Sequence, residues 1–261
     1  MKIKAAILAV SAAALLAACS PAADKSGAPA ADAASTAPVD LKAPAGVYVM
    51  DPTHASLQWS LPHNTISNYT ARFNKFDAKI TLDPANLANS SVEVSIDPAS
   101  VDANYPGDYT GTHAGSGFKT WSEDIAKNKN FLNAGAFPQI TFKSTKVELT
   151  GPRTAKVTGD LTFLGVTKPV TLDATFNGEI EKHPFMQVPT LGFAAEGKFK
   201  RTDFGMALGP VGDEVTIRFD AEFLQQVAPA AAAPAAQGSV NERAGPDGPA
   251  RFSLSILRVS P

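Results

Sequence analysis

The sequence contains a single cysteine, Cys19, among its 261 residues. That count excludes any disulfide bond within the chain. The sequence also lacks an excess of positive charge, because 23 lysines and arginines face 25 aspartates and glutamates, for a formal net charge of −2. Since a protein that binds nucleic acid needs a basic face, this balance argues against a nucleic-acid partner.

The sequence also shows very little helical periodicity. The one segment that favours a helix begins at Thr120, because Thr120 and Glu123 have the spacing of a capping box. Trp121 and Ile125 then lie one helical turn apart, and Asn128 is expected to end the helix. Because no periodic helix separates the other segments, a parallel sheet of βαβ units is disfavoured and antiparallel strands are expected.

The dominant pattern is an alternation of apolar and polar residues, which is typical of strands with one buried face. In residues 170–176, Val170, Leu172, Ala174 and Phe176 alternate with polar side chains. Similar segments recur between residues 55 and 223 and predict about eight strands. A slip in the alternation at residues 74–75 predicts a bulge that bends one strand.

Composition divides the chain into four parts. Residues 1–18 combine two lysines with an apolar run of about 14 residues, which has the layout of a signal peptide and is too short to span a bilayer comfortably. Residues 19–46 comprise Cys19 and a flexible tether rich in alanine and proline. Residues 47–225 form the predicted folded domain. Residues 226–261 are of low complexity and are expected to be disordered.

The predicted signal peptide ends in Leu16, Ala17 and Ala18 before Cys19, which resembles the lipobox of bacterial lipoproteins. The resemblance implies that Cys19 is lipidated and becomes the new N-terminus. Acyl chains on Cys19 would hold the protein on a membrane, because each buried methylene contributes about 0.8 kcal/mol. Ser20 follows the cysteine, which by the sorting rule of lipoproteins implies a periplasmic protein on the outer membrane.

Eight amphipathic antiparallel strands can form either a sandwich or a closed barrel, and the alternation does not distinguish between them. An eight-stranded barrel can in turn fill its interior with side chains or hold one small ligand. The pattern alone therefore leaves the contents of the interior open.

Short motifs run through the whole predicted domain. In order they include Tyr48-x-x-Asp51-Pro52-x-His54-Ala55-Ser56-Leu57, Arg72-Phe73-x-x-Phe76, Phe131-Leu132-Asn133-Ala134, Gly159-x-Leu161-Thr162-x-x-Gly165-Val166-Thr167-Lys168-Pro169 and Arg201-x-Asp203-Phe204-Gly205-Met206. No single motif is decisive, but their order and spacing over residues 48–223 resemble the YceI-like polyisoprenoid-binding family.

This resemblance implies a single eight-stranded, lipocalin-like, all-β barrel with an elongated apolar cavity for a long-chain isoprenoid, either polyprenyl or quinone-like. It implies neither catalytic residues nor a cofactor. We expect the ligand to contact large side chains on the apolar phases of the strands, namely Leu57, Trp59, Phe73, Val94, Phe142, Leu161, Phe163, Phe193 and Phe199. Residues 103–130 depart from the family in being longer and glycine-rich, and we expect them to form a lid or rim at a barrel mouth.

Charged and imidazole side chains give little sign of a reactive centre. The four histidines are His54, His63, His113 and His183. His54 and His63 would face opposite sides of a regular strand, about 30 Å apart, so no metal site is expected. Arg201 and Asp203 are expected to form a salt bridge that closes one end of the barrel, or alternatively to contact the head of a ligand.

The sequence therefore predicts a periplasmic, membrane-anchored carrier for an isoprenoid lipid, with the lipid and the membrane as its partners. A homodimer is a further expectation from the family resemblance. Two other classes of function stay open. One is an enzyme that acts on a lipid or quinone, for which no nucleophile–base pair stands out. The other is a fully packed barrel that serves as a surface interaction module.

Overall fold

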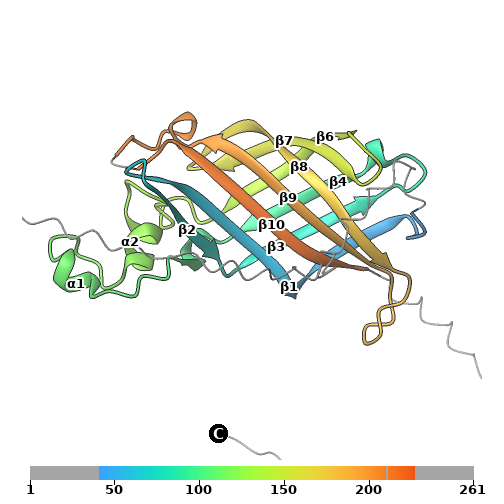
Figure 1. Cartoon of the computed structure of the whole chain (residues 1–261), viewed down its shortest axis with the longest axis horizontal. Coiled ribbons are helices and arrows are strands. Elements are labelled where there is room, and N and C mark those ends of the chain that lie inside the picture. The colour runs from blue at the N-terminus through green and yellow to red at the C-terminus, as the bar shows by residue number, and fades with distance from the viewer. Residues whose placement is uncertain (1–40, 210, 227–261) are drawn as a thin grey trace, which may run out of the picture.

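Ten β-strands and two short α-helices are present in residues 41–209 and 211–226, the part of the chain that the computed structural model describes (Figure 1). The strands are β1 (Gly46–His63), β2 (Ser67–Phe73), β3 (Phe76–Leu82), β4 (Ser91–Ile96), β5 (Val101–Asp102), β6 (Ile140–Leu149), β7 (Thr154–Phe163), β8 (Val166–Ile180), β9 (Thr190–Lys200) and β10 (Glu214–Gln225). The helices are α1 (Tyr109–Thr112) and α2 (Trp121–Lys127), with 3₁₀ turns η1 (Leu87–Asn89), η2 (Pro98–Ser100) and η3 (Arg201–Phe204).

The predicted signal peptide, Cys19 and most of the predicted tether lie outside the described residues, as does the predicted tail from residue 227 onward. Within the described residues, no helix combines the length and the apolar composition needed to cross a bilayer.

Eight strands hydrogen-bond into a closed antiparallel ring in the order β1, β10, β9, β8, β7, β6, β4, β3 and back to β1. The start of β1 pairs with β3, and the end of β1 pairs with β2, which in turn pairs with β5. β2 and β3 are the two halves of one bent strand that breaks at residues 74 and 75, where the alternation slips. The prediction of an eight-stranded antiparallel barrel is confirmed, and closure leaves the ring without a free edge.

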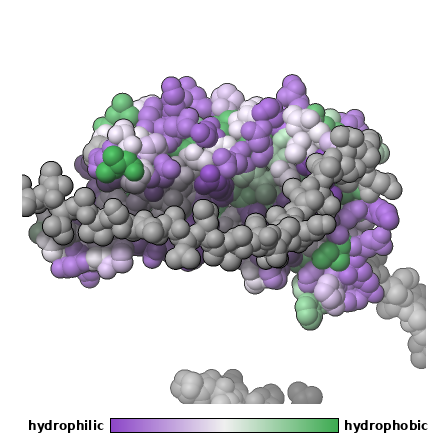
Figure 2. Space-filling model, in the orientation of Figure 1, coloured by the Kyte–Doolittle hydropathy of each residue, from purple (hydrophilic) through white to green (hydrophobic). Residues whose placement is uncertain are grey.

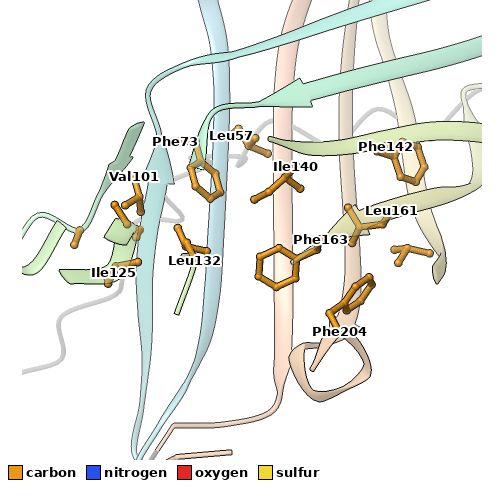
Figure 3. Packing of buried hydrophobic residues seen from close by; sticks show 14 residues of the cluster. Leu57, Phe73, Val101, Ile125, Leu132, Ile140, Phe142, Leu161, Phe163 and Phe204 are labelled. Carbon is orange, nitrogen blue, oxygen red and sulfur yellow. The ribbon is translucent and has the colours of Figure 1, made fainter. Parts of the chain in front are cut away.

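One end of the barrel, which we call the packed end, is filled by a hydrophobic core (Figure 3). Phe73, Leu161 and Phe163 point inward from the strands, and the ring of Phe163 packs against Phe204 of η3. Ile125 and Leu132, from the segment between β5 and β6, complete this core. The departure from the family pattern in residues 103–130 therefore lies at the packed end.

The helix in this segment begins where the capping residues predict. The backbone N–H of Glu123 donates to Oγ1 of Thr120 at 3.1 Å, and Asn128 ends the helix. The hydroxyl of Tyr109 in α1 donates a hydrogen bond to the buried carboxylate of Asp124. Nδ2 of Asn128 donates to the other oxygen of Asp124 at 2.7 Å. Buried carboxylates require such partners. The bond from Tyr109 links α1 to α2, and the bond from Asn128 lies within α2 and its C-cap.

The prediction of a salt bridge between Arg201 and Asp203 is wrong. Arg201 is only 3% exposed, and Asp203 is exposed. The guanidinium donates instead to three backbone carbonyls, those of Gly212 (2.9 Å), Ala207 (2.8 Å) and Val211 (2.9 Å). All three belong to the loop between η3 and β10, so this side chain shapes the loop by hydrogen bonds rather than by an ion pair.

Candidate ligand-binding site

Inward-facing side chains of β7 and β8 change from buried to half-buried along the barrel, whereas Leu191 of β9 and Phe223 of β10 stay buried at the same end in a second core cluster. On β7, Leu161 and Phe163 are buried, whereas Ala155 and Val157 are half-buried. β8 repeats the change, because Val170 is buried and the inward-facing residues from Leu172 to Phe176 are half-buried. Because each of these residues points into the ring, partial exposure means that the interior beyond Leu161 and Val170 is not filled.

The unfilled space in this half, beside the second core cluster, is an apolar cavity of about 180 Å³. Strands β3, β4, β6, β7, β8, β9 and β10 all contribute to its wall. Phe142 belongs both to this wall and to the core of the packed end, so its ring is the floor between the two halves. A closed apolar cavity of comparable size, about 150 Å³, stays dry and accepts a molecule such as benzene.

The cavity has space because small side chains lie side by side on three neighbouring strands. Ala155 pairs with Ala174, Ala174 pairs with Ala195, and all three line the cavity. At the same level Ala195 pairs with Phe219 of β10. These alanines are not among the residues expected to contact the ligand, although Ala174 lies between Leu172 and Phe176 at alternating positions of the sequence. The sequence signal that could have identified them is a small residue between large ones at the inward-facing positions of a strand.

Polar side chains are confined to the rim of the cavity. They are Ser90 and Ser91, before and at the start of β4, and Arg153 and Thr154 at the β6–β7 turn. Arg153 is the one charged residue in the wall. Its Nε donates to the carbonyl of Phe176 at 2.9 Å, and its guanidinium carbon lies 5.0 Å from the centre of the Phe176 ring. Arg153 forms no ion pair with any carboxylate in the described residues.

The chain that precedes β1 reaches the same rim. Leu41 contributes to the cavity wall, and Ala43 is buried. The backbone N–H groups of Lys42 and Ala43 donate to the two carboxylate oxygens of Glu179 at 3.0 and 2.9 Å. The hydroxyl of Tyr48 donates to the carbonyl of Pro44 at 2.8 Å, and burial raises the pKa of this tyrosine. Residues 41–45 are therefore held at the mouth of the cavity.

The structure divides the nine residues that the sequence analysis selected for ligand contact. Val94, Phe142 and Phe193 line the cavity. The other six belong to the core of the packed end or pack against it, namely Leu57, Trp59, Phe73, Leu161, Phe163 and Phe199. The elongated cavity that the resemblance implied is thus confined to one half of the barrel.

The histidines do not gather into one site in the described residues. His54 lies on β1 with its Nδ1 atom 2.8 Å from Asp51 and 4.0 Å from Glu222. His113 stacks on Tyr109 in the segment before α2, and His183 lies in the β8–β9 loop. Asp51, His54 and Glu222 have ligand atoms within 4.8 Å of one another, a cluster that the spacing of the histidines did not suggest. None of the three lines the cavity.

A closed antiparallel barrel with an apolar interior cavity and a few polar groups at its mouth defines a class of small β-barrels that hold a ligand inside. Residues 48–223 match the model of the YceI-like domain. The chain belongs to the YceI-like family.

Individual relatives agree with this assignment. The chain is 37% identical to a UPF0312 protein of Shewanella denitrificans over 70% of this chain and 89% of the relative. It is 36% identical to protein YceI of Escherichia coli over 66% and 83% of the two chains. Among solved structures, BcnA of Burkholderia cenocepacia is 26% identical, with a TM-score of 0.54 over 66% of this chain and 98% of BcnA.

Proposed function

We propose that the protein is a periplasmic carrier that binds an isoprenoid lipid, polyprenyl or quinone-like, with its hydrocarbon in the cavity. The observation that carries this proposal is the apolar cavity behind a polar rim. Each methylene moved from water into such a cavity contributes about 0.8 kcal/mol. Hydrocarbon needs no polar partner inside, and the wall beyond the rim supplies none.

The rim favours one orientation of the ligand. An isoprenoid that enters tail first leaves its polar head beside Arg153, Ser90 and Thr154. Arg153 can donate to a phosphate or a quinone oxygen, because a guanidinium carries five N–H groups. With the head at the rim, a cavity of about 180 Å³ holds only a short length of hydrocarbon.

The membrane anchor belongs to the same proposal. We propose that Cys19 carries the lipid and that the protein resides on the periplasmic side of the outer membrane. The support is the lipobox-like sequence, together with the position of residues 41–45 at the cavity mouth. An anchor whose tether joins the barrel at its mouth would keep the opening within reach of the membrane in which an isoprenoid partitions.

The two other classes of function have less support. A fully packed barrel would leave no space inside, and this barrel has a cavity. An enzyme would need a nucleophile or an acid–base pair beside the ligand, and the cavity wall in the described residues offers Arg153 and the hydroxyls of Ser90, Ser91 and Thr154. Proton transfer or nucleophilic attack by these groups would require a base that the wall does not supply.

The decisive experiment measures the bound lipid against a matched pair of variants. Ala195→Phe adds a ring inside the cavity, and Thr175→Phe adds the same ring on the exposed outer face of β8. Lipid is extracted from protein purified from its native host and quantified by mass spectrometry. We expect near-stoichiometric isoprenoid in the unaltered protein and in Thr175→Phe, and at least tenfold less in Ala195→Phe.

Two results would overturn the proposal: no isoprenoid above background in the unaltered protein, or equal amounts in both variants. Because overpacking costs about 1–3 kcal/mol, thermal unfolding is measured on every sample. A native mass spectrum of the same material reports whether the homodimer expected from the family resemblance forms.

A further inference from the structure

We infer that the cavity end of the barrel carries a bilayer-docking surface, formed by the tip of the β8–β9 loop and the apolar side chains around the mouth. Phe185 and Met186 at the loop tip are 87% and 56% exposed. Ile180 at the end of β8 and Leu149 at the end of β6 are 46% and 58% exposed. The partner that binds this surface is a phospholipid bilayer. Any benefit of this contact for ligand entry rests on the proposed carrier function.

Strand directions place these four side chains at one end of the barrel. β6 and β8 both begin at the packed end and run toward the cavity, so Leu149 and Ile180 lie at its mouth (Figure 1). Leu149 is itself part of the cavity wall. The β8–β9 loop projects beyond the barrel at this end, and Figure 2 shows hydrophobic side chains on that projection amid hydrophilic surface.

The loop tip is an ordered turn. The Nδ1 atom of His183 accepts the backbone N–H of Phe185 at 3.3 Å and that of Met186 at 3.1 Å. Gln187 closes the turn through its own N–H, which donates to the carbonyl of His183 at 2.8 Å. Exposure of two large apolar side chains to water is unfavourable. Because the loop tip is already ordered, it loses less conformational entropy when these side chains enter a bilayer.

The chain before residue 41 makes a bilayer the partner that these observations favour. Lys42 and Ala43 are bound by Glu179, one residue before Ile180, so the described part of the chain begins at the docking end. In the sequence, the apolar run of residues 5–18 and Cys19 precede it. An anchor at Cys19 and an apolar tip at the mouth would then contact the same membrane and hold the opening against it.

The test uses vesicles of phosphatidylethanolamine and phosphatidylglycerol and a chain from Ser20 to Pro261. This chain keeps every described residue, the closed ring and both core clusters, but has no acyl anchor and no cysteine. The docking variant is Phe185→Ser with Met186→Ser. The matched control is Ile66→Ser with Leu208→Ser, which removes residues of 86% and 65% exposure at the packed end.

We expect the unaltered chain to sediment with vesicles, the docking variant to bind at least tenfold more weakly, and the control to bind as the unaltered chain does. High salt should leave the binding in place, since the contact is apolar. Absence of vesicle binding by the unaltered chain, or equal losses in the two double variants, would overturn the inference.

A second measurement does not depend on the stability of the double variants. A polarity-sensitive fluorophore is attached to the single cysteine of Phe185→Cys or, separately, of Ile66→Cys. Vesicles should shift the emission to the blue at residue 185 and not at residue 66. Equal shifts at both positions would overturn the inference.

Two further outcomes separate this inference from its rivals. If sedimentation velocity shows that Phe185 and Met186 hold two copies together, the tip is a dimer interface and the bilayer contact is refuted. If residue 185 enters vesicles but the native protein carries no isoprenoid, the docking surface stands and the carrier function fails.

Discussion

Gly159 of β7 lies directly against the ring of Phe142 on β6, and a β-carbon on Gly159 would lie 2.5 Å from Cζ of that ring. The same β-carbon would lie 2.6 Å from the carbonyl oxygen of Lys143, so the backbone also blocks it. Since Phe142 is the floor between the packed end and the cavity, the absent side chain of Gly159 decides where the cavity begins.

Gly159→Ala is therefore expected to lower the free energy of unfolding by about 1–3 kcal/mol, the usual cost of overpacking. It should also displace the Phe142 ring toward the cavity and reduce the amount of bound lipid. Chemical denaturation and lipid quantification check both effects. A variant as stable as the parent chain, with unchanged lipid content, would show that Phe142 is not fixed by this contact.

Arg153 should select ligands by their head group. Arg153→Gln is expected to weaken binding of a polyprenyl phosphate by about tenfold, or about 1.4 kcal/mol, and to leave binding of the hydrocarbon without a head unchanged. Competition with an apolar dye measures both affinities. Lys156→Gln is the control, because Lys156 binds Asp173 at 2.7 Å and does not line the cavity. Equal losses for both ligands would mean that Arg153 only shapes the turn.

Glu179 should govern how firmly residues 41–45 cover the mouth. Glu179→Ala removes both acceptors of the N–H groups of Lys42 and Ala43, and hydrogen bonds to a charged group are worth about 1.5–3 kcal/mol each. We expect tryptic cleavage after Lys42 to become at least tenfold faster.

Glu181→Ala is the matched control for the mouth. Glu181 approaches Lys42 at 3.9 Å with both side chains mostly exposed, and such a pair contributes little. Cleavage that accelerates equally in both variants would argue against the Glu179 contact.

Arg201 should be among the most sensitive positions for stability. Arg201→Met leaves three carbonyls at the packed end without their donor, which is expected to cost about 3 kcal/mol or more. Arg201→Lys should recover only part of the loss, because an ammonium cannot reproduce the planar fork. Denaturant unfolding gives both values, and the prediction fails if the methionine variant is as stable as the unaltered chain.

The pair of Asp51 and His54 should make stability depend on pH. Hydrogen bonds from Thr53 and then from His54 lower the pKa of Asp51 to about 2, and the bond to Asp51 raises the pKa of His54 above 6.5. A lowered carboxyl pKa contributes stability that is lost as the pH falls from 3.8 toward 2. A raised imidazole pKa contributes stability that is complete below 6.5 and is lost as the pH rises through the raised value.

His54→Ala should therefore differ most from the unaltered chain between about pH 4 and 6.5, and the difference should shrink on either side. Melting temperatures across this range measure it. In the variant, carboxyl titration by NMR should place the pKa of Asp51 higher than about 2. A difference in melting temperature that is constant with pH would refute the coupling.

The sequence by itself determined most of the strands with their inward and outward faces, the bend at residues 74–75 and the helix that Thr120 caps, but not the start of β1 at Gly46 or the two-residue strand β5. All of these depend on short-range rules, namely the period of two and the capping of a first turn. The family, too, could be read from ordered motifs, and residues 48–223 match it.

Only the tertiary structure decided which half of the barrel is hollow. That outcome depends on the register, which brings Ala155, Ala174 and Ala195 to one level and Phe163 close to Phe204 at another. The partners of Arg201 and Glu179 are likewise set by loops that meet only after the ring closes. Contacts between residues far apart in the chain leave no local sequence pattern. The alternation therefore predicts which side chains face inward, but not where those side chains leave a cavity between them.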